Sequence, residues 1–331
     1  MIDLHLHLDG SLSVQTLIKL AEENNISLPG DSVKTLKPYI CAPKKCNDLN
    51  EYLKYFEIPL SVLQTSSALE YAAYDLVKRL DDMKMNYAEI RFAPQLHTMG
   101  SLSQADAVEA VSKGIGKALD SCKRMKARVI LCCMRADGNE KENIETINCA
   151  KSFLNDPVVA VDLAGAEGIY QTRSFKKVFD LAQKYDIPFT IHAGESGGPE
   201  SVRAAIEMGA QRIGHGIRAC EDEKVLEMLI ERNIAFEMCP TSNLQTGVVG
   251  KIKEYPIRRL LKMGAIVTVN TDNMTVSDTD IKKEYALLKK SLSLTAEEEK
   301  MLLLNSVYAS FLPEEDKHTL SEEIYKYGLY I

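Results

Sequence analysis

The sequence predicts an α/β fold, a (β/α)8 TIM barrel. Short apolar runs recur along the chain, and each is followed by a longer segment with helical periodicity, the alternation typical of a parallel sheet covered by helices. The length of 331 residues is sufficient for one such barrel, since these domains often exceed about 250 residues. No flexible linker divides the chain, and we therefore expect a single domain over residues 1–331.

The predicted strands and helices alternate along the chain. The strands are expected at residues 2–7, 87–91, 128–134, 158–163, 188–192, 212–215, 234–238 and 265–270. The helices between them are expected at residues 104–121, 140–154, 174–185, 199–208, 221–231, 257–263 and 278–291. Two further helices, at residues 295–310 and 313–327, are expected to pack outside the barrel at the C-terminus.

Extra helices are also predicted after the first strand. Apolar positions within residues 12–20 recur at helical spacing, a Pro-Gly pair at residues 29–30 interrupts the pattern, and residues 49–56 and 67–83 resume it. We expect this section to cover one end of the barrel and the pocket there, and not to form a separate domain.

The first predicted strand contains two histidines. Its apolar and polar residues alternate with a period of two, so His5 and His7 share one face. Imidazoles at this spacing lie about 6–7 Å apart, close enough for both to bind one metal ion. Histidines also occupy polar positions of half-buried strands without a metal, but the pairing favours a metal site.

Further polar residues lie at the predicted carboxyl ends of the strands, where barrels of this class have their active sites. His192 ends the fifth strand, and Glu195 follows after Gly194, which permits a sharp turn. His215 ends the sixth strand, and Asp272 follows the eighth. A strand-end histidine alone is more often structural, so the functional interpretation depends on the shared rim. The other two histidines, His97 and His318, are predicted to be ordinary surface residues.

The residue types at this rim indicate metal-assisted hydrolysis. Three neutral imidazoles and one carboxylate suit a single Zn²⁺ ion and leave a position for water, whose pKa falls toward about 7. His215 and Asp272 are candidates to orient this water and accept its proton. Glu195 is a candidate proton donor to the substrate, a role that requires burial to raise its pKa.

The composition limits the classes of partner. The net charge of −7 argues against binding to a nucleic-acid polymer, and no apolar run is long enough to span a membrane. No export signal is evident, so a cytoplasmic location is expected. The eight cysteines form no Cys-x-x-Cys pair and are expected to be reduced and structural.

Four short motifs occur in order along the chain. They are His5-Leu6-His7-Leu8-Asp9-Gly10, His192-Ala193-Gly194-Glu195, Gly214-His215-Gly216 and Asn270-Thr271-Asp272. In order and spacing they resemble the motifs of adenosine deaminases of the metal-dependent amidohydrolase superfamily, and residues 91–94, 162–165 and 241–243 are also similar to that family. The resemblance covers nearly the whole chain. It implies a (β/α)8 barrel that hydrolyses a 6-aminopurine nucleoside to the 6-oxo nucleoside and ammonia, a reaction of purine salvage.

The resemblance also implies roles for individual residues. One Zn²⁺ ion would be bound by His5, His7, His192 and Asp272. Glu195 would protonate or hydrogen-bond purine N1, and hydroxide held by His215 and Asp272 would attack C6.

Four residues are expected to contact the substrate: His7, Asp9, Gly165 and Asn273. By the resemblance, Gly165 donates its backbone N–H to purine N3 and Asp9 lies near the ribose 5′-hydroxyl. Asp9 could equally be a turn or helix-capping group.

The chain departs from the commonest family pattern at one position. Asn273-Met274 stands where that pattern has Asp-Pro, and the aspartate normally contacts purine N7. An asparagine amide can donate a hydrogen bond to N7, so recognition of the ring could survive. The exact substrate stays open at this point: adenosine and 2′-deoxyadenosine, or adenine, an N6-modified adenine nucleotide or another 6-aminopurine derivative.

A nucleoside-binding barrel without catalysis is the alternative of a different class, although such a protein would need neither Glu195 nor His215. A cytidine-deaminase type of zinc site is excluded, because the chain has no His-x-Glu and Pro-Cys-x-x-Cys pair of motifs.

Overall fold

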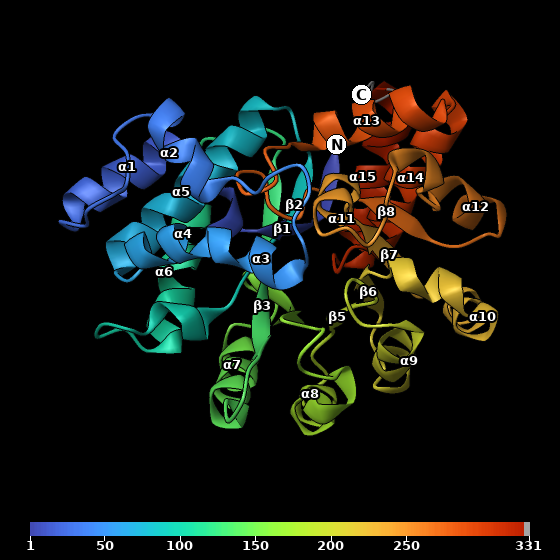
Figure 1. Ribbon diagram of the computed structural model, residues 1–331, viewed down its shortest axis with the longest axis horizontal. Coiled ribbons are helices and arrows are strands. Elements are labelled where there is room, and N and C mark those ends of the chain that lie inside the picture. Colours follow the sequence, from blue (N-terminus) through green and yellow to red (C-terminus); the bar gives the residue numbers. More distant parts are fainter. Residues whose placement is uncertain (328–331) are drawn as a thin grey trace.

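The computed structural model describes residues 1–327 and contains eight parallel strands (Figure 1). They are β1 (Ile2–His7), β2 (Tyr87–Phe92), β3 (Lys126–Arg135), β4 (Val158–Gly165), β5 (Thr190–Ala193), β6 (Arg212–His215), β7 (Ala235–Met238) and β8 (Val267–Val269). All eight predicted strands are present, with ends displaced by no more than a few residues. The predicted domain boundary at Ile331 lies outside the described residues.

The strands form two four-stranded parallel sheets, ordered β1-β2-β3-β4 and β5-β6-β7-β8. Isolated parallel bridges join the sheets at both seams, between Val161 and Phe189 and between Leu6 and Asp272. The seams have single bridges in place of regular ladders, so the barrel is regular within each half and only loosely closed between them. The predicted α/β fold with barrel topology is confirmed.

Helices follow the strands and pack around the barrel (Figure 1). They are α6 (Gln104–Leu119), α7 (Glu140–Ser152), α8 (Lys176–Lys184), α9 (Pro199–Glu207), α10 (Glu223–Glu231), α11 (Pro240–Gln245), α12 (Ile257–Lys262) and α13 (Ile281–Leu292). The predicted C-terminal pair is present as α14 (Ala296–Ala309) and α15 (Glu314–Tyr327). Four of these helices, α6, α10, α13 and α14, begin where a serine, threonine or aspartate side chain accepts a backbone N–H of the first turn, as Ser103 does for α6.

The predicted section after β1 is also helical. It contains α1 (Val14–Glu23), α2 (Val33–Ile40), α3 (Leu49–Leu53), the 3₁₀ turn η2 (Lys54–Phe56), α4 (Glu57–Val62) and α5 (Ser66–Asp82). Figure 1 shows α1 to α6 gathered on one side of the barrel. Side chains of α3, η2 and α4 line the main cavity, so the expectation that this section covers a pocket is confirmed.

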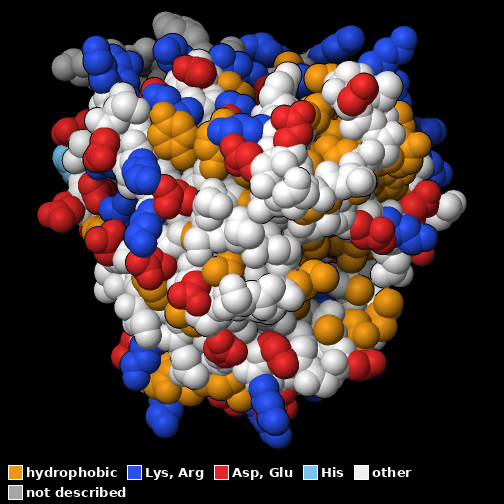
Figure 2. Space-filling model, turned by 90° about the vertical axis from the view of Figure 1, so that its left-hand side faces the viewer, with side chains coloured by type: hydrophobic (Ala, Val, Ile, Leu, Met, Phe, Trp, Pro, Cys, Tyr) orange, Lys and Arg blue, Asp and Glu red, His pale blue; other side chains and the backbone are white. Residues whose placement is uncertain are grey.

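The core follows the alternation of the strands. Leu4 and Leu6 of β1 are fully buried against the surrounding helices, and His5 is buried on the opposite face, inside the barrel. Charged side chains of both signs are interspersed over the face shown in Figure 2, where hydrophobic side chains also reach the surface. Among the described residues, no helix is both long and apolar enough to cross a membrane.

Candidate active site

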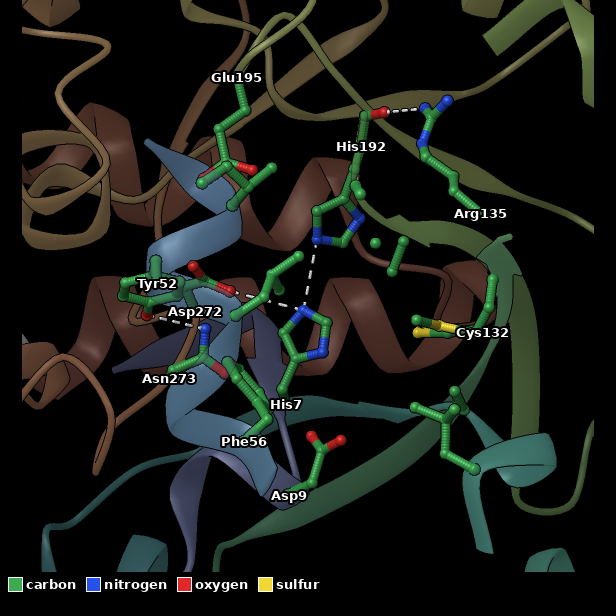
Figure 3. A pocket seen from close by; sticks show the side chains of 18 of the residues that line it. His7, Asp9, Tyr52, Phe56, Cys132, Arg135, His192, Glu195, Asp272 and Asn273 are labelled. Carbon is green, nitrogen blue, oxygen red and sulfur yellow. Dashed lines mark hydrogen bonds and ion pairs between the residues drawn. The ribbon is translucent and has the colours of Figure 1, made fainter. Parts of the chain in front are cut away.

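A cavity of about 270 Å³ lies at the carboxyl ends of the strands (Figure 3). Its lining combines polar side chains from the strand ends with apolar side chains from the inserted helices. The polar contributors include His7, Asp9, Tyr52, Arg135, His192, Glu195, His215, Asp272 and Asn273. The apolar contributors include Leu49, Leu53, Phe56 and Leu60. An apolar enclosure with a few convergent polar groups is typical of a small-molecule site.

Four side chains converge on one side of this cavity: His5, His7, His192 and Asp272. Each side chain offers one atom that can bind a metal ion, and these four atoms lie within 4.8 Å of one another. The Nε2 atoms of His7 and His192 are 3.3 Å apart, and Asp272 Oδ1 is 3.4 Å from Nε2 of both His5 and His7. Imidazole nitrogens and a carboxylate oxygen directed at one point are the ligands that Zn²⁺ prefers. The donor set therefore fits a zinc ion.

Two buried carboxylates set the tautomers of these histidines. Glu237 Oε2 lies 2.8 Å from Nδ1 of His5, and Asp162 Oδ2 lies 2.8 Å from Nδ1 of His192. Burial acts to raise the pKa of both carboxyls, but the nearby Arg91 guanidinium and the histidines hold each pKa well below its usual value. Ionised carboxylates accept the Nδ1 hydrogens, so the Nε2 lone pairs are free to face a metal.

Sequence reasoning did not assign roles to Arg91, Asp162 or Glu237. Arg91 joins the two carboxylates, with its NH1 2.9 Å from Asp162 and its NH2 3.0 Å from Glu237, and all three side chains are fully buried. The sequence does contain a signal for these residues, because β4 and β7 each have one charged residue among apolar ones, and β2 has two, Glu89 and Arg91. Such charges are almost never fully buried unless they are paired.

The backbone of Asp272 joins two strands of the barrel, and its side chain is one of the four that converge on the cavity. His7 N–H donates to its carbonyl oxygen and its own N–H donates to the His5 carbonyl, both at 2.8 Å, so it joins the chain after β8 to β1. Its φ of 60° is in the left-handed region, as is that of His215 at 61°. Burial acts to raise the pKa of Asp272, but hydrogen bonding to His5 and the neighbouring histidine charges keep it below its usual value.

Glu195 follows a tightly anchored turn. Gly194 has a φ of 74°, and a Cβ there would lie 2.6 Å from Val202. The Glu167 carboxylate accepts the N–H groups of Gly194 at 2.7 Å, Glu195 at 3.0 Å and Ser196 at 2.8 Å. Burial, reinforced by the charges of Asp272 and Glu167, raises the pKa of Glu195 well above its usual value. This shift favours the protonated form, which a proton donor requires.

The orientation of His215 is defined by a chain of hydrogen bonds. Tyr255 donates its hydroxyl hydrogen to Asn243 Oδ1 at 2.8 Å, which turns the amide nitrogen of Asn243 toward His215 Nδ1 at 3.0 Å. Since Nδ1 accepts this hydrogen bond, neutral His215 has its hydrogen on Nε2, 3.5 Å from Glu195 Oε2. Burial lowers the pKa of His215 well below its usual value and favours the neutral form.

The expected substrate-binding residues also line the cavity. Asp9 begins a 3₁₀ turn and its Oδ1 accepts the Gly10 N–H at 3.0 Å, so the turn-forming alternative has a contact to support it. Burial raises the pKa of Asp9 to about 6. Gly165 ends β4 with a φ of 100°, a conformation that suits glycine. Asn273 donates from Nδ2 to the hydroxyl of Tyr52 at 3.1 Å. The sequence analysis did not single out Tyr52.

The prediction for His97 was wrong. Its side chain is fully buried, Nδ1 lies 2.9 Å from the Leu63 carbonyl oxygen, and burial lowers its pKa to about 4. The turn that contains His97 packs against α6 and α7, and its histidine contacts the segment that follows α4, which a local sequence pattern does not reveal. His318 is 75% exposed, as predicted for a surface residue.

Comparison with known proteins agrees with this geometry. A family model described as adenosine deaminase matches residues 1–327. The chain belongs to the adenosine deaminase family. It is 52% identical over 327 residues to an adenosine deaminase of Haemophilus ducreyi, covering 98% of this chain and 95% of the relative. A solved adenine deaminase from Arthrobacter aurescens has a TM-score of 0.90 at 25% identity and 99% coverage of both chains. An Arabidopsis N6-mAMP deaminase has a TM-score of 0.84 at 25% identity, covering 96% of this chain and 95% of the other.

Membership of the adenosine deaminase family confirms the resemblance drawn from the four motifs. The structure brings seven motif residues together at one rim, although they lie between positions 5 and 272 of the chain. They are His5, His7, Asp9, His192, Glu195, His215 and Asp272.

Proposed function

We propose that this protein is a zinc-dependent hydrolase of purine salvage that converts adenosine and 2′-deoxyadenosine into inosine and deoxyinosine, with release of ammonia. The main support is the convergence of three imidazoles and Asp272 beside a cavity that also contains Glu195, whose pKa is raised by burial. The 52% identity to an adenosine deaminase supports adenosine as the substrate. The proposal places one Zn²⁺ ion in each chain and treats residues 1–331 as one catalytic domain.

The metal would be bound by His5, His7, His192 and Asp272. A Zn²⁺ ion there supplies Lewis-acid activation of water at neutral pH. Glu195 donates a proton or a hydrogen bond to N1 of the purine, which withdraws electrons from C6 and favours attack by water on that carbon. The anchored turn from Gly194 to Ser196 holds Glu195 in place for this transfer.

His215 and Asp272 have distinct tasks in this proposal. Neutral His215 presents an Nε2–H donor, so it orients the oxygen of the attacking water and stabilises the charge that develops there. Asp272 is ionised and has only acceptor atoms, so it is the group that receives the proton of the water. This division is narrower than the sequence expectation, in which either residue accepts the proton.

The remaining contacts orient the nucleoside. Asp9 accepts from the ribose 5′-hydroxyl, the Gly165 N–H donates to N3, Asn273 donates to N7, and His7 lies beside the ring. The apolar side chains of the inserted helices cover the other surface of the cavity and exclude water.

Steady-state kinetics test the proposal. We expect kcat/KM to be highest for adenosine or 2′-deoxyadenosine and much lower for adenine, with about one zinc per chain by metal analysis. A strong preference for adenine would overturn the choice of substrate, and the similarity to a solved adenine deaminase makes this the second candidate. A protein that binds nucleosides without deaminating any of them after zinc addition would instead be a silent barrel.

We also propose a cytoplasmic location. All eight cysteines are free thiols, and most are buried. This supports a reducing compartment, since chains in oxidising compartments more often contain disulfides.

A further inference from the structure

Tyr52 is a polar side chain of the cavity lining that lies outside the family motifs. Tyr52 lies on the inserted helix α3, is only 2% exposed, and contacts residues that follow β8. Its hydroxyl oxygen is 3.1 Å from Nδ2 of Asn273 and 2.7 Å from Oγ of Ser277. Figure 3 shows the amide nitrogen of Asn273 turned toward this hydroxyl. Tyr52 therefore connects the helix that covers the cavity to the residue expected to recognise the substrate ring.

The direction of these hydrogen bonds follows from the chemistry of the groups. An amide nitrogen only donates, so the hydroxyl of Tyr52 accepts from Asn273. In its second hydrogen bond, to Ser277, either hydroxyl can be the donor. Burial raises the pKa of Tyr52 well above its usual value, which keeps the hydroxyl neutral and able to make the hydrogen bonds to both Asn273 and Ser277.

The packing around Asn273 favours this amide orientation. A Cβ on Gly10 would lie 1.8 Å from Asn273 Oδ1, so the glycine makes room for that oxygen. Oδ1 is buried and has no hydrogen-bond partner among the described residues. Turning the amide over would put two N–H donors at this position in place of one acceptor, at a greater cost in unpaired polar groups.

We propose that Tyr52 is a specificity-determining positioning residue, which accepts one hydrogen of the Asn273 amide and thereby directs the second hydrogen at an acceptor nitrogen in the five-membered ring of the substrate. This inference rests on the proposed deaminase function. The asparagine needs such a partner because an amide, unlike a carboxylate, presents chemically different atoms when it rotates by half a turn.

Tyr52→Phe is the test, with adenosine and 7-deazaadenosine as substrates, since the latter has C–H in place of N7. We expect kcat/KM for adenosine to fall by about 5- to 30-fold, because one buried hydrogen bond is lost and the amide is no longer held. The value for 7-deazaadenosine should change little, so the preference for adenosine over the deaza compound should shrink. Where turnover of 7-deazaadenosine is too slow, its competitive inhibition constant provides the same comparison.

Two further variants keep the test decisive. Tyr55→Phe is the matched control, because this tyrosine belongs to the adjacent turn η2 and does not line the cavity. The preference of this variant for adenosine over 7-deazaadenosine should equal that of the wild type. Ser277→Ala removes the second hydrogen-bond partner of the Tyr52 hydroxyl, and we expect a smaller loss of preference in the same direction. This variant also serves if Tyr52→Phe does not fold.

A wild-type enzyme without activity on adenosine would refute the proposed function. An active wild type whose Tyr52→Phe variant loses equal factors on both substrates would refute only the role of Tyr52.

Discussion

At the amino ends of the strands, buried charges are paired with opposite charges, whereas at the carboxyl ends the carboxyl groups of Asp272 and Glu167 lie near that of Glu195. Arg212 at the start of β6 contacts Glu89 and Glu237, both at 2.6 Å. Glu195, by contrast, lies among Asp272 and Glu167, whose charges raise its pKa further above the value that burial alone would give. The paired charges hold the barrel together, and the group of carboxyls around Glu195 is suited to proton transfer.

The amino-end pairs also connect the barrel to its C-terminal helices. Arg212 donates to the Ala309 carbonyl at 2.9 Å, and the Phe311 N–H donates to Glu89 at 2.7 Å. Glu237 belongs to both regions, because its other oxygen accepts from His5. A buried charge is therefore informative about function only together with its neighbours.

Replacing His192 by alanine should have the largest effect. We expect zinc content to fall far below one per chain, activity to be lost, and the melting temperature to decrease, because bound metal stabilises the folded state by mass action. Metal analysis, activity assays and thermal unfolding with and without added zinc measure these changes. His318→Ala is the control, since that histidine is exposed. Unchanged metal content in His192→Ala would contradict the assignment.

Glu195→Gln removes a proton donor while keeping its volume. We expect turnover of adenosine to fall by at least about a hundredfold. Zinc content should remain near that of the wild type, because Glu195 is not among the proposed ligands. Single-turnover kinetics and metal analysis of the same sample separate the two quantities, and near-normal turnover would show that the proton comes from elsewhere.

Glu284 tests whether a raised pKa near the rim is sufficient for function. It is buried outside the cavity lining, accepts the Thr241 N–H at 3.0 Å and contacts Thr279, and burial raises its pKa to about 7. A carboxyl whose pKa is raised in the folded state contributes stability below its unfolded pKa of about 4.5, and this contribution is lost as pH rises through about 7.

Glu284→Gln should therefore match the wild type in stability near pH 5 and become relatively more stable as pH rises to 8. The difference should grow by up to about 1.4 kcal/mol per pH unit within the window. Denaturant unfolding at several pH values measures it, and a difference that is independent of pH would contradict the role of burial. Turnover should change little, because Glu284 does not line the cavity.

Arg212→Lys tests the buried ion pairs at the amino ends of the strands, and we expect its effect to be the smallest of the four substitutions. Lysine keeps the charge but lacks the forked donors that reach Glu89 and Glu237 together, so we expect a loss of about 1–3 kcal/mol in the free energy of unfolding. Arg173→Lys is the matched control, because its ion pair with Glu207 is largely exposed and should contribute almost nothing. Equal effects of the two substitutions would remove the distinction between buried and exposed pairs.

Several features of this protein could be predicted from the sequence alone. The eight strands and most helices follow from local periodicity, which depends only on neighbours in the chain. The motif histidines, Glu195 and Asp272 could be assigned to one rim because the strands of a parallel barrel all have their carboxyl ends on the same side.

Other features required the tertiary structure. The burial of His97, the tautomer of His215 and the partnership of Tyr52 with Asn273 depend on segments distant in sequence that pack together only after the barrel closes. Periodicity identifies which face of an element is buried, but it does not identify the partner of a polar group on that face. That partner is determined by the closure of β1 against the segment after β8 and by the helices laid over the cavity.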